Sequence, residues 1–495
     1  MASPRVVIIG AGAAGVFTAC RLRQRHGDDF EVVLLERTGR VGGNAQSITV
    51  AFGGTEYSID CGAQFFSRNP QPSYVSLLED LGLFNDPAQI DARATGITLW
   101  DRQAGQRLLW LPSHLSGFLR YQPQDWNRLI GFATLLVYAF LLDRRSPANW
   151  SLSVDEWVDG LTLLDTQFKN QILRRFLYQF LTLPADRIGD ASALYAITYF
   201  VRNVFGETGV DEPSPDVPAP PDGPTFEVYQ SRIGLDGVLT RALDAAQIVP
   251  RLSEPVMAVS RNGTGGLDVT TSLGTIVADH VVFATDPNVA AAILSAGAFP
   301  SPGLIAALAA CEYSDLSISL QSGGSCWMPD DQSYWEAVNT VADGDDLQFS
   351  VWFGALRDTF GGDTRIPVFK SWATGNLDPG SCPHTFFSHA HRILMPTTTF
   401  MTNRQTVQAR QGENGVWFAG GWTTWFDSQE AALDSATAVV DALGGQSRVA
   451  AAGPTRSPNA DRDRISRWLS AVAAWAPVER RRMLKNLLAD VEAHG

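Results

Sequence analysis

The sequence predicts an α/β protein in which a Rossmann-type domain is interrupted by an α+β insertion and followed by a helical tail. Three observations lead to this fold class. Residues 5–36 read as an apolar strand, a glycine turn, an amphipathic helix and a second strand, the opening βαβ unit of a doubly wound sheet. Residues 91–203 have a mainly helical pattern, whereas residues 316–370 hold short aromatic-rich strands typical of an antiparallel sheet. Residues 415–443 return to a buried strand followed by a helix.

Changes in composition along the chain place the domain boundaries. Residues 211–224 hold six prolines in 14 residues, so this loop can be neither a helix nor a central strand. Beyond Ala451 a Pro/Ser/Arg linker leads to a charged amphipathic tail. We therefore expect a discontinuous Rossmann-type domain of residues 1–95, 226–300 and 405–450, an inserted domain of residues 96–225 and 301–404, and a helical extension of residues 451–495.

Charge and cysteine usage limit the function classes. The chain has 495 residues, with 52 acidic and 38 basic side chains and a net charge of −14. An acidic surface repels phosphate backbones, so we expect no nucleic-acid partner. The cysteines show no CxxC pair, which argues against a disulfide framework or a zinc site and favours a reducing, cytoplasmic location. The five are Cys20, Cys61, Cys311, Cys326 and Cys382.

The longest apolar run, Leu129–Leu142, has 14 residues. That is short of the roughly 20 residues that cross a bilayer, so we expect no transmembrane segment. A buried helix is the favoured interpretation. The alternative is a surface that touches a membrane or admits an apolar substrate.

The first motif is the turn Gly10-Ala-Gly12-Ala13-Ala14-Gly15, which lies between the first strand and the first helix. The first glycine permits the tight turn, the second lets a pyrophosphate approach, and the third lets the helix pack on the strand. Glu36 follows at the end of the next strand, where it can accept bonds from both ribose hydroxyls. The alternative, a glycine turn that serves packing only, does not explain this acid. The turn and Glu36 therefore predict a bound dinucleotide.

The continuation of this motif favours FAD over NAD. Arg37 and Arg40 lead into the pair Gly42-Gly43 and then Asn44. Arg40 can neutralise a pyrophosphate, and the glycine pair lets the backbone pass a flavin. Two later segments read as further approaches to the cofactor: Ala63, Gln64 and Phe65; and Gly420, Gly421, Gln429 and Ala432. The N-terminus of the last helix could stabilise negative charge on a reduced flavin.

The order of these elements resembles the flavin-containing amine oxidase superfamily, which includes monoamine oxidases, protoporphyrinogen oxidases, carotenoid desaturases and polyunsaturated fatty acid isomerases. The resemblance implies FAD, an FAD-binding Rossmann-type domain and an inserted substrate domain. It also implies that the backbone at Val256 holds adenine and that a strand ending at Thr285 lies beneath the cofactor. The stretch around Trp327-Met328-Pro329 looks most like a bacterial group often found near lipid-modifying genes.

The sequence departs from the amine-oxidising pattern of this superfamily. Its usual lysine near flavin N5 has no counterpart on the expected strand, residues 316–320, and the chain's lysines are Lys169, Lys370 and Lys485. Ser428 replaces a cage tyrosine, Gly421 and Trp422 replace the motif glutamate, and Asn44 replaces an arginine. No cysteine follows Gly420, so we expect FAD to be bound non-covalently.

Aromatic residues before the final helix are the candidates for the substrate wall. Trp422, Trp425 and Phe426, with Phe65 and Phe66, could cover the flavin, although each could equally be ordinary core. Asp427 could be a base or an anchor, but capping of the helix that begins at Gln429 is the favoured interpretation. We select Trp422, Trp425 and Asp427 as catalytic candidates.

A histidine cluster, His384, His389 and His391 with Arg392, gives no metal-site pattern, because no carboxylate or thiolate joins it. We treat it as a solvated loop and expect no metal.

Together these features predict an FAD-dependent oxidoreductase that removes a hydride from a largely apolar, unsaturated substrate, with dehydrogenation or double-bond migration as the outcome. One alternative is an amine oxidase without the usual lysine. Another is a non-catalytic, escort-type protein on the same fold, which the complete glycine motif disfavours. The sequence does not predict an oligomeric state.

Overall fold

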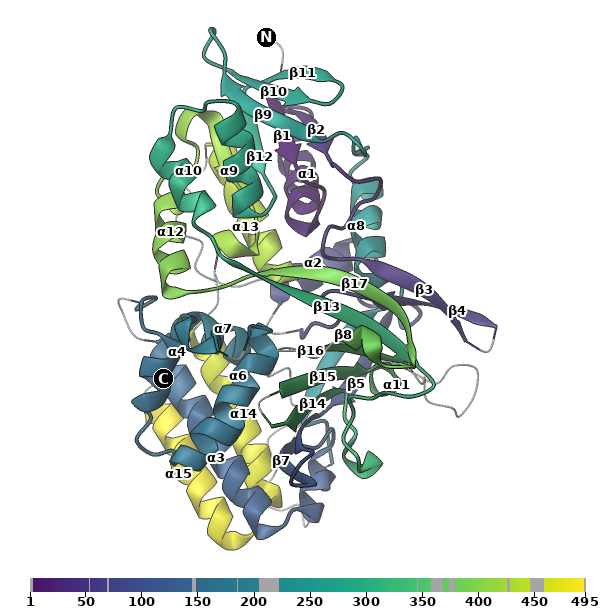
Figure 1. Cartoon of the computed structure of the whole chain (residues 1–495), viewed down its shortest axis with the longest axis vertical. Helices are drawn as coiled ribbons and strands as arrows, with labels where there is room; N and C mark the ends of the chain where they lie inside the picture. The colour runs from purple at the N-terminus through teal and green to yellow at the C-terminus, as the bar shows by residue number, and fades with distance from the viewer. Residues whose placement is uncertain are drawn as a thin grey trace.

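The computed structural model describes residues 3–52, 54–68, 71–144, 148–184, 186–203, 222–344, 346–357, 368–373, 379–424, 428–445 and 458–493. These residues form an elongated molecule with an upper and a lower lobe (Figure 1). Residues 211–221 of the proline-rich loop and the candidates Trp425, Phe426 and Asp427 lie outside the described residues.

A parallel sheet in the order β18-β12-β1-β2 forms the centre of the upper lobe. Its strands come from three distant parts of the chain: β1 (Arg5–Ile9), β2 (Glu31–Leu35), β12 (His280–Phe283) and β18 (Val416–Phe418). Val6 and Ile8 of β1 pack into one core, and Val7 and Ile9 pack into another on the opposite face. Because both faces are buried, the strands read as continuous apolar runs.

Helices and a small sheet cover the two faces of this parallel sheet. One face carries α1 (Ala13–His26), α2 (Pro72–Asp80), α8 (Gly234–Ala245) and α13 (Gln429–Leu443). The other carries α9 (Pro287–Ala296), α10 (Pro302–Ala309), α12 (Thr398–Gln408) and the antiparallel strands β9 (Val256–Arg261), β10 (Leu267–Thr271) and β11 (Gly274–Ala278). The hairpin β3 (Ser47–Phe52) and β4 (Thr55–Asp60) leaves this lobe to one side (Figure 1).

A seven-stranded sheet in the order β17-β13-β16-β15-β14-β6-β7 links the two lobes. Its strands are β6 (Ile97–Asp101), β7 (Gln106–Leu111), β13 (Tyr313–Ser322), β14 (Val338–Asp343), β15 (Asp346–Trp352), β16 (Val368–Ala373) and β17 (Thr385–Leu394). All neighbours are antiparallel except β14 and β6. The face that carries Leu320, Val338 and Val351 packs into the largest core of the molecule.

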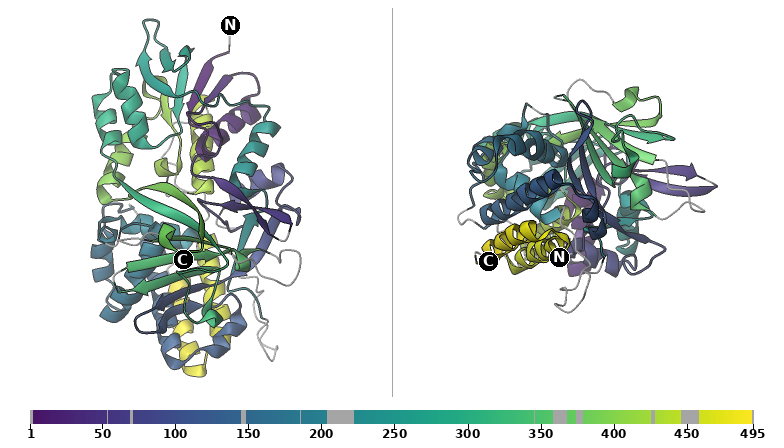
Figure 2. Two further views of the ribbon diagram at one scale, coloured as in Figure 1. Left: turned by 45° about the vertical axis from the view of Figure 1, so that its right-hand side comes forward. Right: turned by 90° about the horizontal axis from the view of Figure 1, so that it is seen from below.

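Helices of the lower lobe supply the rest of that core. They are α3 (Pro123–Asp143), α4 (Val154–Asp159), α5 (Thr166–Phe168), a π-helical turn (Lys169–Leu173), α6 (Arg174–Leu181), α7 (Ala193–Asn203), α14 (Pro458–Trp475) and α15 (Val478–Ala493), with the short α11 (Phe353–Leu356) near the sheet. The C-terminal pair α14 and α15 lies along α3 when the molecule is seen from below (Figure 2). Among the described helices only α3 is long and apolar enough to cross a membrane, and 67% of its apolar stretch is buried here.

One expectation about the inserted segment was wrong. Residues 91–203 do not begin as helix, because β5 (Ile90–Thr95), β6 and β7 come first, and β5 pairs with β8 (Phe226–Ser231). Pairing of β6 with the distant β14 favours strands in a region whose later part is helical.

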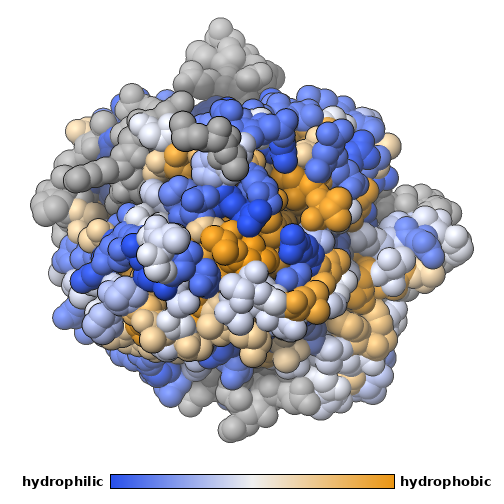
Figure 3. Space-filling view, turned by 90° about the horizontal axis from the view of Figure 1, so that it is seen from above, coloured by the Kyte–Doolittle hydropathy of each residue, from blue (hydrophilic) through white to orange (hydrophobic). Residues whose placement is uncertain are grey.

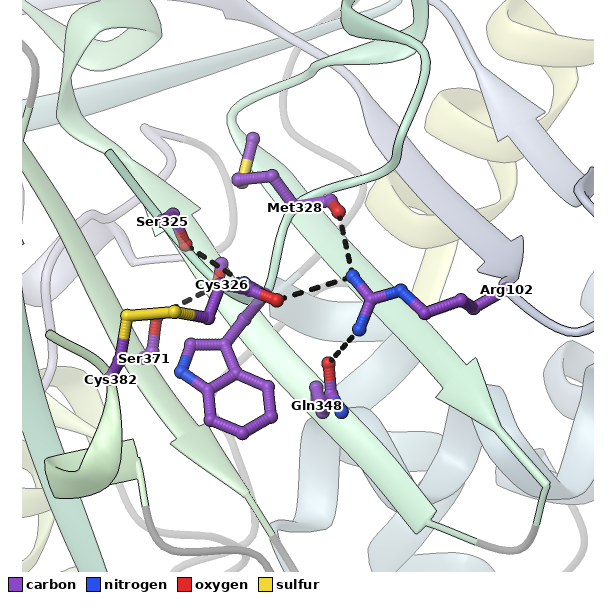
Figure 4. The surroundings of a disulfide bond; sticks show 9 residues. Arg102, Ser325, Cys326, Met328, Gln348, Ser371 and Cys382 are labelled. Carbon is purple, nitrogen blue, oxygen red and sulfur yellow. Dashed lines mark hydrogen bonds between the residues drawn. A yellow bond between two sulfur atoms is a disulfide. The ribbon is translucent and has the colours of Figure 1, made fainter. Parts of the chain in front are cut away.

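The cysteine prediction also needs a correction. Cys326 and Cys382, 56 residues apart in the sequence, form a disulfide with their Cα atoms 6.0 Å apart. Beside it, Arg102 donates to the backbone oxygens of Cys326 and Met328 (Figure 4). The Cys326–Cys382 disulfide holds the connection between β13 and β14 over the face of the seven-stranded sheet that is turned away from the largest core. The cytoplasmic location therefore stays a prediction that the cysteines no longer support.

Apolar side chains gather near the middle of the upper end of the molecule, among hydrophilic ones (Figure 3). Exposed apolar residues of the β9–β11 region include Met257, Leu273 and Val277. Peripheral membrane contact stays a prediction.

Candidate active site

The three glycines after β1 differ in what the structure requires of them. Gly10 has a φ of 102°, which favours glycine. A Cβ on Gly15 would lie 1.8 Å from the carbonyl oxygen of Gly10, so only glycine lets α1 pack against β1. A Cβ on Gly12, by contrast, would meet nothing closer than the Gly42 oxygen at 3.9 Å. Gly12 therefore adjoins open space, at the start of a helix that has no side-chain cap and no acid in its first turn.

Glu36 is buried beside this turn. Its carboxylate accepts bonds from the backbone N–H of Ala11 at 2.9 Å, and from the N–H and hydroxyl of Thr38, each at 2.9 Å. Its own carbonyl accepts the N–H of Glu254 at 2.9 Å, which brings the start of β9 and Val256 to the same side. Glu36 is thus held where the sequence predicts a ribose.

Residues 40–43, the Arg-x-Gly-Gly element, pack against the glycine turn of residues 10–15. The N–H of Gly42 donates to the oxygen of Ala11 at 2.9 Å, and a Cβ on Gly43 would lie 3.3 Å from the Cα of Gly12. Arg40 donates to the carbonyl of Gly43 at 2.9 Å and to Gln46 at 3.1 Å. Arg40 therefore braces its own loop in this structure, and the prediction that it neutralises a pyrophosphate stays untested. Arg37, Asn44 and Ala63 are exposed around this element.

Gln64 gives a sign of a bound polar group next to this loop. It is 6% exposed, and neither its amide nitrogen nor its amide oxygen has a hydrogen-bond partner. A buried amide without partners costs about 1–3 kcal/mol per unsatisfied group, so a ligand is expected to satisfy it. The segment lies close to the Arg-x-Gly-Gly loop, since a Cβ on Gly62 would fall 2.1 Å from the oxygen of Asn44.

The two phenylalanines after Gln64 separate. Phe65 is half-buried and packs against the largest core, which is compatible with a place on the substrate wall. Phe66 turns into the upper lobe, where its ring lies 5.2 Å from Tyr74 and 5.8 Å from Tyr229. Phe66 is therefore part of the ordinary core, the alternative that the sequence equally allowed, because this strand-like segment sends alternate side chains to opposite sides.

The turn between β18 and α13 contacts Thr285, which lies next to Gly10 of the glycine turn. Gly420, with a φ of 155°, donates its N–H to the hydroxyl oxygen of Ser435 at 2.9 Å. Half-buried Trp422 donates its indole N–H to the carbonyl of Thr285 at 3.2 Å, and Gly421 is buried. A Cβ on Gly10 would in turn lie 3.1 Å from Thr285. Trp422 thus joins this turn to the strand beneath the predicted cofactor.

The start of α13 is capped by Ser428, whose hydroxyl accepts the N–H of Ala431 at 3.0 Å. The expectation that Asp427 caps this helix was therefore wrong. Gln429 and Ala432 lie in the first turn of this helix, and their contacts with the cofactor stay a prediction.

Sequence reasoning missed Lys370. The resemblance to the superfamily places a lysine on residues 316–320, which lack one. In the structure β13 pairs with β16, so that Lys370 on the neighbouring strand lies opposite Leu320. Lys370 is 2% exposed and donates to the carbonyl of Gly62, two residues before Gln64. Burial lowers the pKa of Lys370 to about 7. A single lysine within the apolar stretch Val368–Ala373 was the signal that could have found it.

Asp60 lies near Lys370 and is also buried. It accepts the hydroxyl of Ser47 at 2.6 Å and the N–H of Leu235 at 2.9 Å. Burial raises the pKa of Asp60 to about 6, despite these bonds and the nearby charges of Arg357 and Lys370.

The histidines lie on an edge strand instead of a loop. His389 and His391 alternate along β17, opposite Ile318 and Leu316, and so share the sheet face of Lys370. Burial, with smaller contributions from Lys370 and His389, lowers the pKa of His391 to about 4. His384 is exposed before the strand. The described residues contain no group of three metal-ligating side chains.

The fold and this site define a dinucleotide-dependent oxidoreductase: the carboxyl ends of parallel strands, a glycine turn at a helix N-terminus and a second, largely apolar domain meet at one place. The family model for flavin-containing amine oxidoreductases matches residues 13–319. The chain therefore belongs to that family and is an FAD-dependent oxidoreductase. The open space at Gly12 and the unpartnered amide of Gln64 fit FAD, which these residues would hold together with Glu36.

Solved structures agree with this fold. A CLA-producing fatty acid isomerase from P. acnes superposes with a TM-score of 0.62 at 11% identity, covering 90% of this chain and 99% of that one. Cyclohexylamine oxidase from Brevibacterium oxydans gives 0.61 at 16% identity, covering 89% and 100%. Reduced UDP-galactopyranose mutase gives 0.61 at 11% identity, covering 93% and 98%. No curated protein gives a significant match to the sequence.

Proposed function

We propose that this protein removes a hydride from a carbon of a largely apolar, unsaturated substrate, which leads to dehydrogenation or double-bond isomerisation. The observation that carries the proposal is the apolar sheet face around Lys370. Leu320 and Val351 flank Lys370 across the sheet, and the rings of Phe349 and Trp372 pack beside it, tilted by 31° with their centroids 4.0 Å apart. When bound, FAD supplies a hydride acceptor.

The residues of the chain would hold and shield the substrate. The apolar face, with half-buried Trp422 and Phe65, excludes water, which strengthens every electrostatic interaction inside. Lys370 fixes the carbonyl of Gly62, and its lowered pKa lets it hold or release a proton near neutrality. That one similar structure is a fatty acid isomerase supports this choice of substrate.

Amine oxidation is the second candidate, and Lys370 favours it, because the lysine that the sequence lacks on residues 316–320 is supplied by β16. A protonated amine needs a carboxylate or paired aromatics. Against it, Asp60, the acid near Lys370, is only 1% exposed and bonds Ser47 and Leu235 through Oδ1, which leaves only its buried Oδ2 without a partner.

Anaerobic mixing of the holoenzyme with a panel of unsaturated acids and a panel of primary amines tests the two candidates. We expect the acids to bleach the flavin, or to appear with a shifted double bond without net bleaching, so product analysis accompanies the spectra. Bleaching by amines, with no change in any acid, would overturn the proposal in favour of the second candidate.

A further inference from the structure

Arg404, on α12, is a buried cation without an acidic partner. Arg404 is 3% exposed, and no carboxylate of the described residues forms an ion pair with its guanidinium. Burial lowers the pKa of Arg404 to about 10, opposed only by the hydroxyl of Tyr195. The buried Arg107, by comparison, pairs with Asp125. An uncompensated buried charge is costly, and such charges are normally paired.

One edge of the Arg404 guanidinium is free. Nη1 donates to the carbonyl of Thr424, whereas Nε is buried and has no partner, and Nη2 donates to no atom of the described residues. In Arg107 the same edge holds a carboxylate, with Nε donating to one oxygen of Asp125 at 2.9 Å and Nη2 to the other. Arg404 therefore offers the two N–H donors, Nε and Nη2, that would bind a carboxylate in a bidentate contact. Its plane is fixed by Trp150, whose ring lies 4.3 Å from the guanidinium carbon.

Arg404 lies beside a turn of the candidate active site. Thr424 directly follows the turn Gly421–Thr423, which holds Trp422 against Thr285. Gln408, one helical turn after Arg404, donates to the carbonyl of Thr423 at 2.6 Å, so α12 supports this turn through two side chains. Trp150 and Tyr195 belong to the lower lobe, which places Arg404 at the border of the two lobes.

We propose that the Nε–Nη2 edge of Arg404 binds a carboxylate of the substrate. The inference rests on the proposed function and narrows it: the apolar, unsaturated chain carries an acid group, which supplies the charge that Arg404 lacks. Supporting the turn at Thr424 needs only Nη1, so it does not account for the free edge.

Binding of a decenoate and of the matching neutral decenamide to the holoenzyme tests this, with the shift of the flavin spectrum and the rise in melting temperature as readouts. Wild type should bind the acid at least about tenfold more tightly than the amide. Arg404→Met should bring the ratio close to one, and Arg404→Lys should leave an intermediate ratio because lysine keeps the charge but not the fork. Gln408→Met, the control for support of the turn, should weaken both probes alike and keep the ratio.

Equal binding of acid and amide by wild type would overturn the carboxylate site while leaving an apolar substrate intact. The same conclusion follows if the acid preference survives in Arg404→Met. If phenylacetate binds in an Arg404-dependent way while neither decenoate nor decenamide binds, the carboxylate site stands and the apolar-chain function fails. Should Arg404→Met not fold, the ratio in Arg404→Lys and in wild type decides.

Discussion

Single residues of the glycine turn make separable contributions to folding and to cofactor binding. A Cβ is tolerated at Gly12 but would clash with backbone at Gly15. We therefore predict that Gly12→Val folds with a nearly unchanged melting temperature but loses FAD, because the side chain fills the open space. Gly15→Val should instead fail to fold stably. Flavin absorbance per protein and thermal unfolding check both, and full flavin content in Gly12→Val would remove the turn from the cofactor site.

Lys370 gives the protein a pH-dependent stability. In the folded protein the pKa of Lys370 is about 7, against 10.5 in an unperturbed lysine. Between these values the unfolded chain binds the extra proton, so the free energy of unfolding rises with pH over this window. From pH 7 to pH 9 wild type should gain roughly 2 kcal/mol over Lys370→Met in urea unfolding. A difference between the two proteins that does not change with pH would show that Lys370 is not buried as a neutral amine.

The flavin should be released intact on acid precipitation. Cys61 is the thiol closest in sequence to Gly62 and Gln64, and burial raises the pKa of the Cys61 thiol to about 11, so it carries little nucleophilic thiolate. All the yellow colour is expected in the supernatant. Colour retained by the protein pellet would identify a covalent link.

At the level of elements, local signals were sufficient where strand and helix follow one another in sequence. The glycine turn places β1 and α1, and the helix expected at Gln429–Leu443 has those bounds in the structure. Local sequence signals failed for strands whose pairing partners are distant in the sequence. Lys370 reaches the site through the register of β13 and β16, and β6 joins a sheet whose strands, apart from β7, follow more than 200 residues later. Neither the free edge of Arg404 nor the unpartnered amide of Gln64 has a sequence signature.

The disulfide is likewise a long-range contact, and it fixes the connection from β13 to β14. We predict that the denatured, unreduced protein shows three reactive thiols, Cys20, Cys61 and Cys311, and five after reduction. A thiol titration with and without reductant measures this. Cys326→Ser should free Cys382 and lower the melting temperature, since a closed loop of this length contributes about 3–4 kcal/mol in the chain-entropy model. Five reactive thiols before reduction would restore the prediction of unpaired cysteines.

At the scale of the whole molecule, the C-terminal helices are part of the fold and not an appendage. Trp468 of α14 is 1% exposed and stacks on Phe226 of β8, with ring centroids 6.3 Å apart and planes 9° apart. Phe132 of α3 meets the same indole at 6.1 Å. One side chain thus joins the tail, the long apolar helix α3 and a strand that pairs with β5, so the tail closes a core that the rest of the chain leaves open.

Trp468→Ala should therefore lower the free energy of unfolding by about 3–5 kcal/mol, as expected for a large aromatic side chain removed from a core. Val478→Ala, at a position of the same tail that is 80% exposed, is the matched control and should change it by less than about 0.5 kcal/mol. Urea unfolding followed by tryptophan fluorescence and by circular dichroism measures both. Because FAD binds the upper lobe, flavin content should be retained in Trp468→Ala below its melting temperature. A Trp468→Ala protein as stable as wild type would mean that α14 and α15 rest on the surface of the lower lobe and do not complete its core.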